Sequence, residues 1–310
     1  MPAVREHDLV AIVAAFDPRT RGIVLIVSSP IRHPHRPFDQ KPFRLRVGAR
    51  PLEEADWLEV DGQYQQHVRE RLRLLTENHE DVFRALHGTE ASGAEVLALV
   101  RDHMSTHHPE IALDVHSMSP ELHPLDVAGR LVQEDLCLMD REEPGDEYRL
   151  VAASLCFPSR WRLADKIGRP LSEIHQPVPH YAEQLNSATN SLFDRLTPER
   201  PIWRLNWSLL DDPALYQPTG HSAPSQATPP EQLWLRIERQ TLRRLPDTRA
   251  VLFTIRIHIS PLTDLVDLRD REQLAVALSG LPETMLRYKS MAGFAQEIVA
   301  WLRGQSPRSI

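Results

Sequence analysis

The stretch that decides the fold runs from residue 233 to residue 259 and reads LWLRIERQTLRRLPDTRAVLFTIRIHI. Its second half alternates apolar and polar residues, with Thr254, Arg256 and His258 opposite a row of five apolar side chains: Val251, Phe253, Ile255, Ile257 and Ile259. Its first half alternates in the same way, with Arg236, Glu238 and Gln240 opposite Leu233, Leu235 and Ile237. A period of two is the pattern of a half-buried strand. These residues therefore predict two antiparallel strands joined by a turn at residues 245–249.

The sequence before this hairpin predicts the rest of an antiparallel sheet. Residues 201–210 alternate Trp203, Leu205, Trp207 and Leu209 with Arg204, Asn206 and Ser208, and so predict a third strand. Residues 131–139 and 147–157 are β-compatible runs around a turn with Pro144 and Gly145. Between the run at 147–157 and the strand at 201–210, residues 158–199 contain helical stretches at 160–167 and 181–195. Two strands, a helical insert and a three-stranded meander is the element order of a PAS domain.

The fold class expected is therefore α+β, with a PAS-like five-stranded antiparallel sheet that has a helical insert and is preceded and followed by helices. Helices are expected at residues 64–77, 92–104 and 283–303, the last burying Met291, Phe294, Ile298 and either Trp301 or Leu302. We divide the chain into an N-terminal extension (1–40), a helical front segment packing on the core (41–130), a PAS-like domain with a C-terminal helix (131–303) and a tail (304–310). The extension is either an added hairpin or a poorly ordered segment.

Composition and charge exclude several classes of protein. The 310 residues carry 36 basic and 43 acidic side chains, and the basic ones are scattered. No basic stripe is available to neutralise phosphates, so neither nucleic acid nor an anionic membrane surface is an expected partner. The longest apolar runs, at residues 9–16 and 23–27, are shorter than the ~18 residues of a membrane span. Acidic Glu6 and Asp8 stand where a secretory signal has basic residues, so we expect a cytoplasmic protein.

The cysteines and most histidines give little indication of a metal or catalytic site. Cys137 and Cys156 are too few for an iron–sulfur cluster or a Cys-rich zinc site, and we expect buried, reduced thiols rather than a disulfide. Three histidine pairs are close enough in sequence to suggest a metal, but none has the HExxH spacing, and loop histidines on a solvated surface are the better interpretation. These pairs are His33 with His35, His107 with His108, and His116 with His123.

The segment with the clearest chemical potential is residues 159–181, SRWRLADKIGRPLSEIHQPVPHY. His175 and His180 flank two prolines that stiffen the loop. A neutral imidazole is a good axial ligand of haem iron. Arg160, Arg162 and Lys166 are placed upstream to meet haem propionates through charge-assisted hydrogen bonds. The alternative is that both histidines only cap or bridge the loop backbone.

Several long blocks resemble one known family. They are KPFRLRVGARPLEEADWLEVDGQY (41–64), LVQEDLCLM (131–139), SLCFPSRWRLADKIGRPLSEIHQPVPHY (154–181), RLNWSL (204–209), LWLRIERQTLRRLPDTRAVLFTIRIHISPL (233–262) and MLRYKSM (285–291). Together they are similar to the catalytic subunit of haem-dependent oxidative N-demethylases. The resemblance covers roughly residues 41–302 and leaves the first forty residues unexplained.

The resemblance implies that the PAS-like domain binds haem b and uses O2 to oxidise a methyl group of a small secondary amine such as dimethylamine, with release of formaldehyde. The absence of CxxCH agrees with non-covalent haem. The chain has no GxGxxG motif and only two cysteines, so electrons must come from a flavin or iron–sulfur reductase subunit.

Within this resemblance His175 is the expected iron ligand and His180 the reserve, while a thiolate of Cys137 or Cys156 is a further alternative. The polar faces of the last two strands supply the catalytic candidates Arg236, Glu238, Arg256 and His258. Glu238 would hold an alkylammonium or accept its proton, because oxidation needs the neutral amine. Arg204 and Asn206 would orient oxygen or a propionate. The competing interpretations are a solvated face or structural salt bridges. Two other functions compete with the enzyme. One is a PAS sensor that binds haem or a small ligand without turning it over, and the other is a scaffold that has lost haem.

Overall fold

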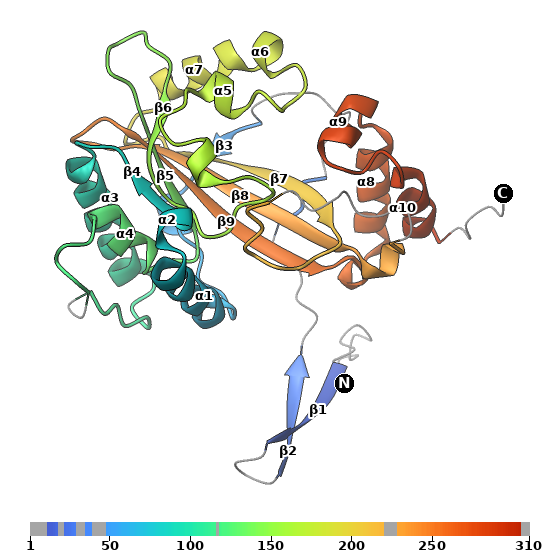
Figure 1. Ribbon diagram of the computed structural model, residues 1–310. Helices are drawn as coiled ribbons and strands as arrows, with labels where there is room; N and C mark the ends of the chain where they lie inside the picture. The colour runs from blue at the N-terminus through green and yellow to red at the C-terminus, as the bar shows by residue number, and fades with distance from the viewer. Residues whose placement is uncertain are drawn as a thin grey trace, which may run out of the picture.

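The computed structural model describes residues 11–17, 22–28, 35–38, 48–115, 118–219 and 228–304. Its main body is an α+β fold built on an open antiparallel sheet (Figure 1). Seven strands form the sheet in the order β3-β7-β8-β9-β5-β6-β4. The strands are β3 (Arg50–Pro51), β4 (Phe83–Ala85), β5 (Asp135–Asp140), β6 (Arg149–Ser154), β7 (Ile202–Leu210), β8 (Trp234–Arg244) and β9 (Val251–Pro261).

The expected meander and hairpin are both present. Strand β8 pairs with β7 on one side and β9 on the other, while β5 lies between β9 and β6. The number of strands differs from the expected five, because β3 extends the sheet beyond β7 and β4 extends it beyond β6. These edge strands contain two and three residues, which is too short to display an alternating pattern.

The helices of the described residues lie around the sheet in three groups. They are α1 (Tyr64–Glu77), α2 (His79–Val82), α3 (Glu90–His107), α4 (Pro124–Gly129), α5 (Leu171–Ile174), α6 (Tyr181–Gln184), α7 (Asn186–Arg195), α8 (Leu268–Ser279), α9 (Glu283–Tyr288) and α10 (Ala295–Leu302). Figure 1 shows α1 to α4 beside β4 and β5, α5 to α7 as a second group and α8 to α10 at the far end of the sheet.

Several helix predictions need correction. The expected helix at 160–167 is only a 3-10 turn at Leu163–Asp165, followed by Gly168 with a positive φ of 76°. The C-terminal helix is broken near Ser290, which has a φ of 58°, into α9 and α10. Helix α8 was not foreseen. The expected apolar face at the C-terminus is confirmed, with Leu302 buried and Trp301 partly buried.

The two faces of the sheet are covered by different parts of the chain. Leu136, Leu138 and Leu252 pack on the helical front segment through α3 and α4. On the opposite face, Cys137 and Met139 pack with the insert helices α5 and α7. Helices α8 to α10 cover apolar side chains of β7 and β8 at the other end. The space between the insert and the sheet is where the candidate site lies.

A buried ion pair fixes the front helices to the sheet and to the start of the insert. Arg71 of α1 donates from Nη1 to Asp135 Oδ1 of β5 at 2.7 Å, and from Nε to the carbonyl oxygen of Gly129 at 2.8 Å. The same Asp135 carboxylate accepts hydrogen bonds from the backbone N–H groups of Cys156 and Phe157. This network therefore sets where the chain leaves β6 and enters the insert.

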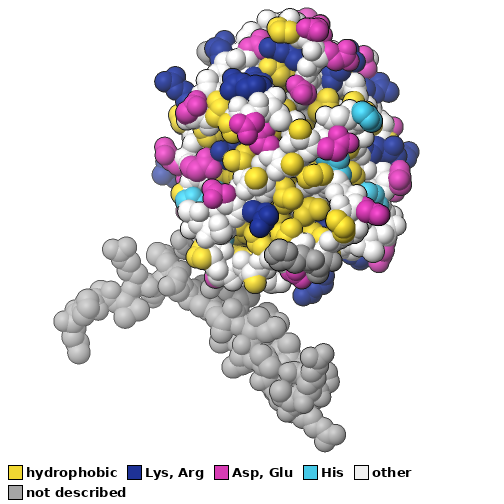
Figure 2. All heavy atoms as spheres, turned by 90° about the vertical axis from the view of Figure 1, so that its left-hand side faces the viewer, with side chains coloured by type: hydrophobic (Ala, Val, Ile, Leu, Met, Phe, Trp, Pro, Cys, Tyr) yellow, Lys and Arg dark blue, Asp and Glu magenta, His cyan; other side chains and the backbone are white. Residues whose placement is uncertain are grey.

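The remaining predictions concern the surface and the ends of the chain. In the first forty residues, β1 (Ala11–Asp17) and β2 (Gly22–Ser28) pair as an antiparallel hairpin, one of the two alternatives considered. His33, His116 and most of the 304–310 tail lie outside the described residues. No helix among the described residues is long and apolar enough to cross a membrane. On the face seen in Figure 2, acidic and basic side chains are interspersed.

Candidate active site

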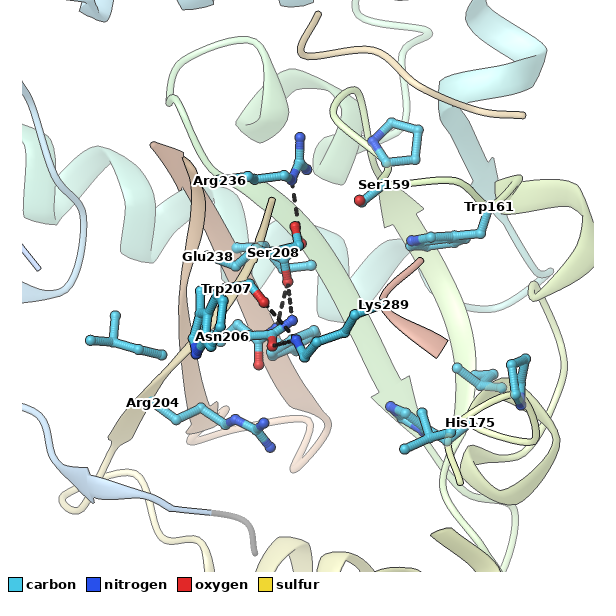
Figure 3. Close-up of a pocket in the computed structure, with 18 of the residues that line it drawn as sticks. Ser159, Trp161, His175, Arg204, Asn206, Trp207, Ser208, Arg236, Glu238 and Lys289 are labelled. Carbon is cyan, nitrogen blue, oxygen red and sulfur yellow. Dashed lines mark hydrogen bonds and ion pairs between the residues drawn. The ribbon is translucent and has the colours of Figure 1, made fainter. Parts of the chain in front are cut away.

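A cavity of about 770 Å³ lies between the insert and the sheet. Its walls come from β5, β7, β8 and β9, from the insert residues 158–193, and from α9. This volume is within the roughly 300–1,000 Å³ of small-molecule and cofactor sites. Figure 3 shows polar side chains on the sheet side and Trp161 and His175 on the insert side.

The polar wall centres on the Glu238 carboxylate. In the register of β7 and β8, Asn206 lies directly opposite Glu238. Asn206 Nδ2 donates to Glu238 Oε2 at 3.2 Å, and Gln240 Nε2 donates to the same oxygen at 2.9 Å. Arg236 Nε is 3.5 Å from Oε1 (Figure 3). Two amides and a guanidinium thus hold the carboxylate of Glu238 in place at the cavity wall.

Three arginine side chains line the cavity, and each has a buried N–H group that forms no hydrogen bond. Arg204 has no hydrogen bond or ion pair within the described part of the chain, and its Nε is buried. Arg236 is 1% exposed and donates only from Nη2, to the carbonyl oxygen of Phe157, leaving Nε and Nη1 without a hydrogen bond. The buried Nε of Arg160 is also unbonded. Burial lowers the pKa of all three groups. Buried cations of this kind are suited to anionic acceptors such as carboxylates.

The insert presents a neutral imidazole to the cavity. His175 follows α5, and its Nδ1 is 2.9 Å from the carbonyl oxygen of Leu171. A carbonyl can only accept, so Nδ1 carries the proton and the lone pair is on Nε2. Desolvation lowers the His175 pKa to about 4, which keeps the ring neutral at pH 7. The ring stacks on Tyr181 with centroids 4.5 Å apart.

Lys166 holds this histidine loop in place. Its Nζ donates to the carbonyl oxygen of Ile174 at 2.9 Å and lies 4.7 Å from the centre of the Trp161 ring. Burial lowers the pKa of Lys166. Lys166 therefore fixes the backbone of Ile174, the residue immediately before His175.

Lys289 is a pocket residue that our sequence reasoning missed. It follows α9 and donates from Nζ to Asn206 Oδ1 at 3.3 Å and to the carbonyl oxygen of Trp207 at 2.5 Å (Figure 3). Burial lowers its pKa to about 8. The available signal was the scarcity of lysine, which occurs only at positions 41, 166 and 289 in an arginine-rich chain. Two of these three positions line the cavity.

A family model described as haem-dependent oxidative N-demethylase, alpha subunit-like, matches residues 48–299. The chain belongs to this family. The matched range contains all of the described cavity-lining residues except Pro37 and Phe38. The name of the family states haem dependence and oxidative N-demethylation, the oxidative removal of a methyl group from nitrogen.

In this N-demethylase alpha-subunit-like chain, the structure brings most of the candidate residues together around one cavity. They are Arg160, Lys166, His175, Arg204, Asn206, Arg236 and Glu238. His180 and Arg162 do not line it. Both are exposed, and His180 precedes α6 with a positive φ of 60°.

Arg256 and His258 lie on the other face of the sheet, which corrects their grouping with Glu238. The register pairs Glu238 with Ile257 and Arg239 with Arg256. Directly paired residues of antiparallel strands share a face, so the polar side chains of β9 face away from those of β8 that line the cavity. Arg256 donates to Asp61 Oδ2 at 2.7 Å, and His258 contacts Glu59, both on the side of the front segment.

The cysteines of this family member are free and buried, as expected. Cys137 lines the cavity, whereas Cys156 does not. Burial raises the pKa of both thiols, that of Cys156 to about 12. A thiolate ligand from either cysteine is therefore disfavoured.

Proposed function

We propose that this chain binds haem b in the cavity through His175 and oxidises a methyl group of a small secondary amine, of the dimethylamine class, using O2. The observation that carries the proposal is a neutral imidazole, with its Nε2 lone pair available, in the same cavity as three guanidinium groups that each have buried N–H groups without a hydrogen bond. Family membership adds haem dependence.

The residues present fit a haem group. His175 Nε2 would ligate the iron, with Nδ1 held by the Leu171 carbonyl group, an arrangement that fixes the tautomer of a ligating histidine. Arg160, Arg204 and Arg236 would pair with the two propionates, which would satisfy donors now unbonded. When bound, haem supplies the activation of O2 that removes the methyl group.

Glu238 is the group we assign to the amine. Its carboxylate holds an alkylammonium by a charge-assisted hydrogen bond and accepts the proton that must leave before the nitrogen or its methyl group is oxidised. Asn206 and Gln240 fix the carboxylate, while Ile255 and Ile257 supply an apolar surface for the methyl groups.

The strand order supports the PAS-like interpretation of the core. The five longer strands of the sheet are β5 to β9, with the helical insert between β6 and β7 and with the first and last strands adjacent. The two edge strands are additions to this core. Because this arrangement also suits a sensor, the runner-up function is haem or small-ligand sensing without turnover.

Electrons must reach the site from outside the chain. The sequence has no GxGxxG motif and only two cysteines, both buried as free thiols. A flavin or iron–sulfur reductase subunit is therefore the proposed partner. The two reduced thiols favour a cytoplasmic location.

The first test replaces each candidate ligand. After reconstitution with haem, the parent chain is expected to show a Soret band, which His175→Ala loses and His180→Ala keeps. His180 is a matched control because it lies in the same loop but is exposed. The reverse pattern would move the ligand to His180, and a parent chain without a Soret band would end the proposal.

The second test concerns turnover. Glu238→Gln keeps the shape of the side chain but removes its charge and basicity, so haem binding should persist. Formaldehyde release from dimethylamine, driven by a chemical reductant, should fall roughly 100-fold. Parental activity in this variant would remove Glu238 from the mechanism. Absence of turnover by the parent with any small methylated amine would favour the sensor.

A further inference from the structure

A second group of potential ligands lies on the sheet face opposite the haem cavity. His35 Nε2 is 2.6 Å from Glu59 Oε1, and His258 Nε2 is 2.9 Å from Glu59 Oε2. One ligand atom from each residue lies within 4.8 Å of the others. The three residues come from separate parts of the chain: the segment 35–38, the loop after the 3-10 turn Glu54–Asp56, and β9.

The donor set is one that proteins use for transition metals. Two imidazole nitrogens and a carboxylate bind divalent ions such as Zn²⁺ and leave further coordination positions for water. Bonds of about 2.0–2.1 Å to a tetrahedral ion place the ligand atoms about 3.3 Å apart. The present separations of 2.6 and 2.9 Å need to open by less than 1 Å, which side-chain rotations can supply.

The burial of the three side chains is suited to a retained ion. The exposed fractions are 14% for His35, 22% for Glu59 and 7% for His258. The group is thus shielded from bulk water but still accessible. Our sequence-based interpretation of His35 as a solvated loop residue is therefore wrong.

The surroundings hold Glu59 in position. The Glu59 backbone N–H donates to Glu134 Oε1 at 2.9 Å, and the other oxygen of this buried carboxyl group has no hydrogen bond. Arg239 Nε is 3.4 Å from Glu59 Oε1, but its terminal nitrogens are fixed on the carbonyl oxygens of Trp57 and Asp56. The Arg239 charge opposes a second cation, so we expect micromolar rather than nanomolar affinity.

We propose that His35, Glu59 and His258 form a binding site for a divalent transition-metal ion of the Zn²⁺ class, separate from the haem cavity. The bound ion ties the segment 35–38 to the loop at Glu59 and to β9. That segment is already attached by an Arg36–Asp270 ion pair of 2.7 Å and by the buried Phe38 ring. Since the folded chain alone assembles the three ligands, Zn²⁺ should raise the melting temperature.

The test is a Zn²⁺ titration of the untagged, chelator-treated, haem-free full chain by isothermal calorimetry. We expect one site per chain with a micromolar Kd. His35→Gln and Glu59→Gln should each weaken binding at least tenfold and abolish the melting-temperature shift. His107→Gln should leave both unchanged, because His107 belongs to a different histidine group with His103.

Co²⁺ absorption gives a second readout that does not depend on stability. Visible d–d bands should form at one equivalent in the parent and be absent in His35→Gln. His35→Gln is the deciding variant, because its short segment precedes the sheet and circular dichroism can verify an intact fold. The proposal is overturned by a parent chain that does not bind Zn²⁺, or by weak multi-site binding shared equally by all variants.

Discussion

Among single residues, Lys289 bears most directly on the charge balance of the cavity. Its ammonium group lies with the guanidinium groups of Arg204 and Arg236 in a cavity where Glu238 is the nearby counter-charge. Without haem propionates, the cavity therefore carries an excess of positive charge. This excess agrees with a cofactor that brings two carboxylates, and it makes the protonation of Lys289 sensitive to what the cavity holds.

The lowered pKa of Lys289 predicts a pH-dependent stability. The folded-state pKa is about 8 against an ordinary value of 10.5, so between these pH values the unfolded chain holds more protons and stability rises with pH. Lys289→Met removes this effect. The free energy of unfolding of the haem-free parent, minus that of the variant, should rise by about 2–3 kcal/mol from pH 7 to pH 10. Urea unfolding at both pH values measures it, and a pH-independent difference would contradict the burial of a charged amine.

His175 and His180 illustrate how little sequence separation says about role. Both flank the same pair of prolines, and spacing alone could not distinguish them. The difference is made by the backbone: His175 ends a helical turn whose Leu171 carbonyl accepts its Nδ1 proton, whereas His180 takes a left-handed conformation and is exposed. Such a distinction depends on tertiary structure, which local patterns do not encode.

At the scale of elements, alternation identified the long strands but not their relative register. Strands β7, β8 and β9 follow the expected ranges within a few residues at most ends. The polar faces of β8 and β9 were nevertheless grouped together, although a register pairing Glu238 with Ile257 puts them on opposite sides of the sheet. A shift of one residue exchanges the faces of a strand, and the sequence of either strand alone does not fix it. The sequence did not predict the His35–Glu59–His258 group for a similar reason, because its three residues come from separate parts of the chain.

The contact between α1 and β5 predicts a large difference between two arginines of one helix. Arg71 is fully buried and paired with Asp135, so Arg71→Met should destabilise the chain by about 3–5 kcal/mol, because an unpaired carboxylate remains. Arg73 pairs with Glu70 and Glu77 on the exposed side of the same helix. Arg73→Met should hardly move the urea midpoint, because exposed pairs contribute little. Similar midpoints for the two variants would show that the buried pair does not anchor α1.

For the whole molecule, the match to the family begins at residue 48, yet the structure continues the cavity wall to Pro37 and Phe38. Phe38 is 4% exposed and packs in the apolar cluster that contains Trp207 and Leu281. The boundary of the folded unit is thus set by packing and lies before the boundary of the family match.

Two truncations test this boundary. A chain that begins at residue 35 should keep the His175-dependent Soret band and unfold at nearly the parental urea concentration. A chain that begins at residue 48 loses the Phe38 ring and the Arg36–Asp270 pair, and should be less stable by about 3 kcal/mol, as for removal of a buried aromatic side chain. The shorter chain should also bind haem more weakly, because one cavity wall is open to water. Equal stability of the two truncated chains would show that residues 35–38 do not belong to the folded unit.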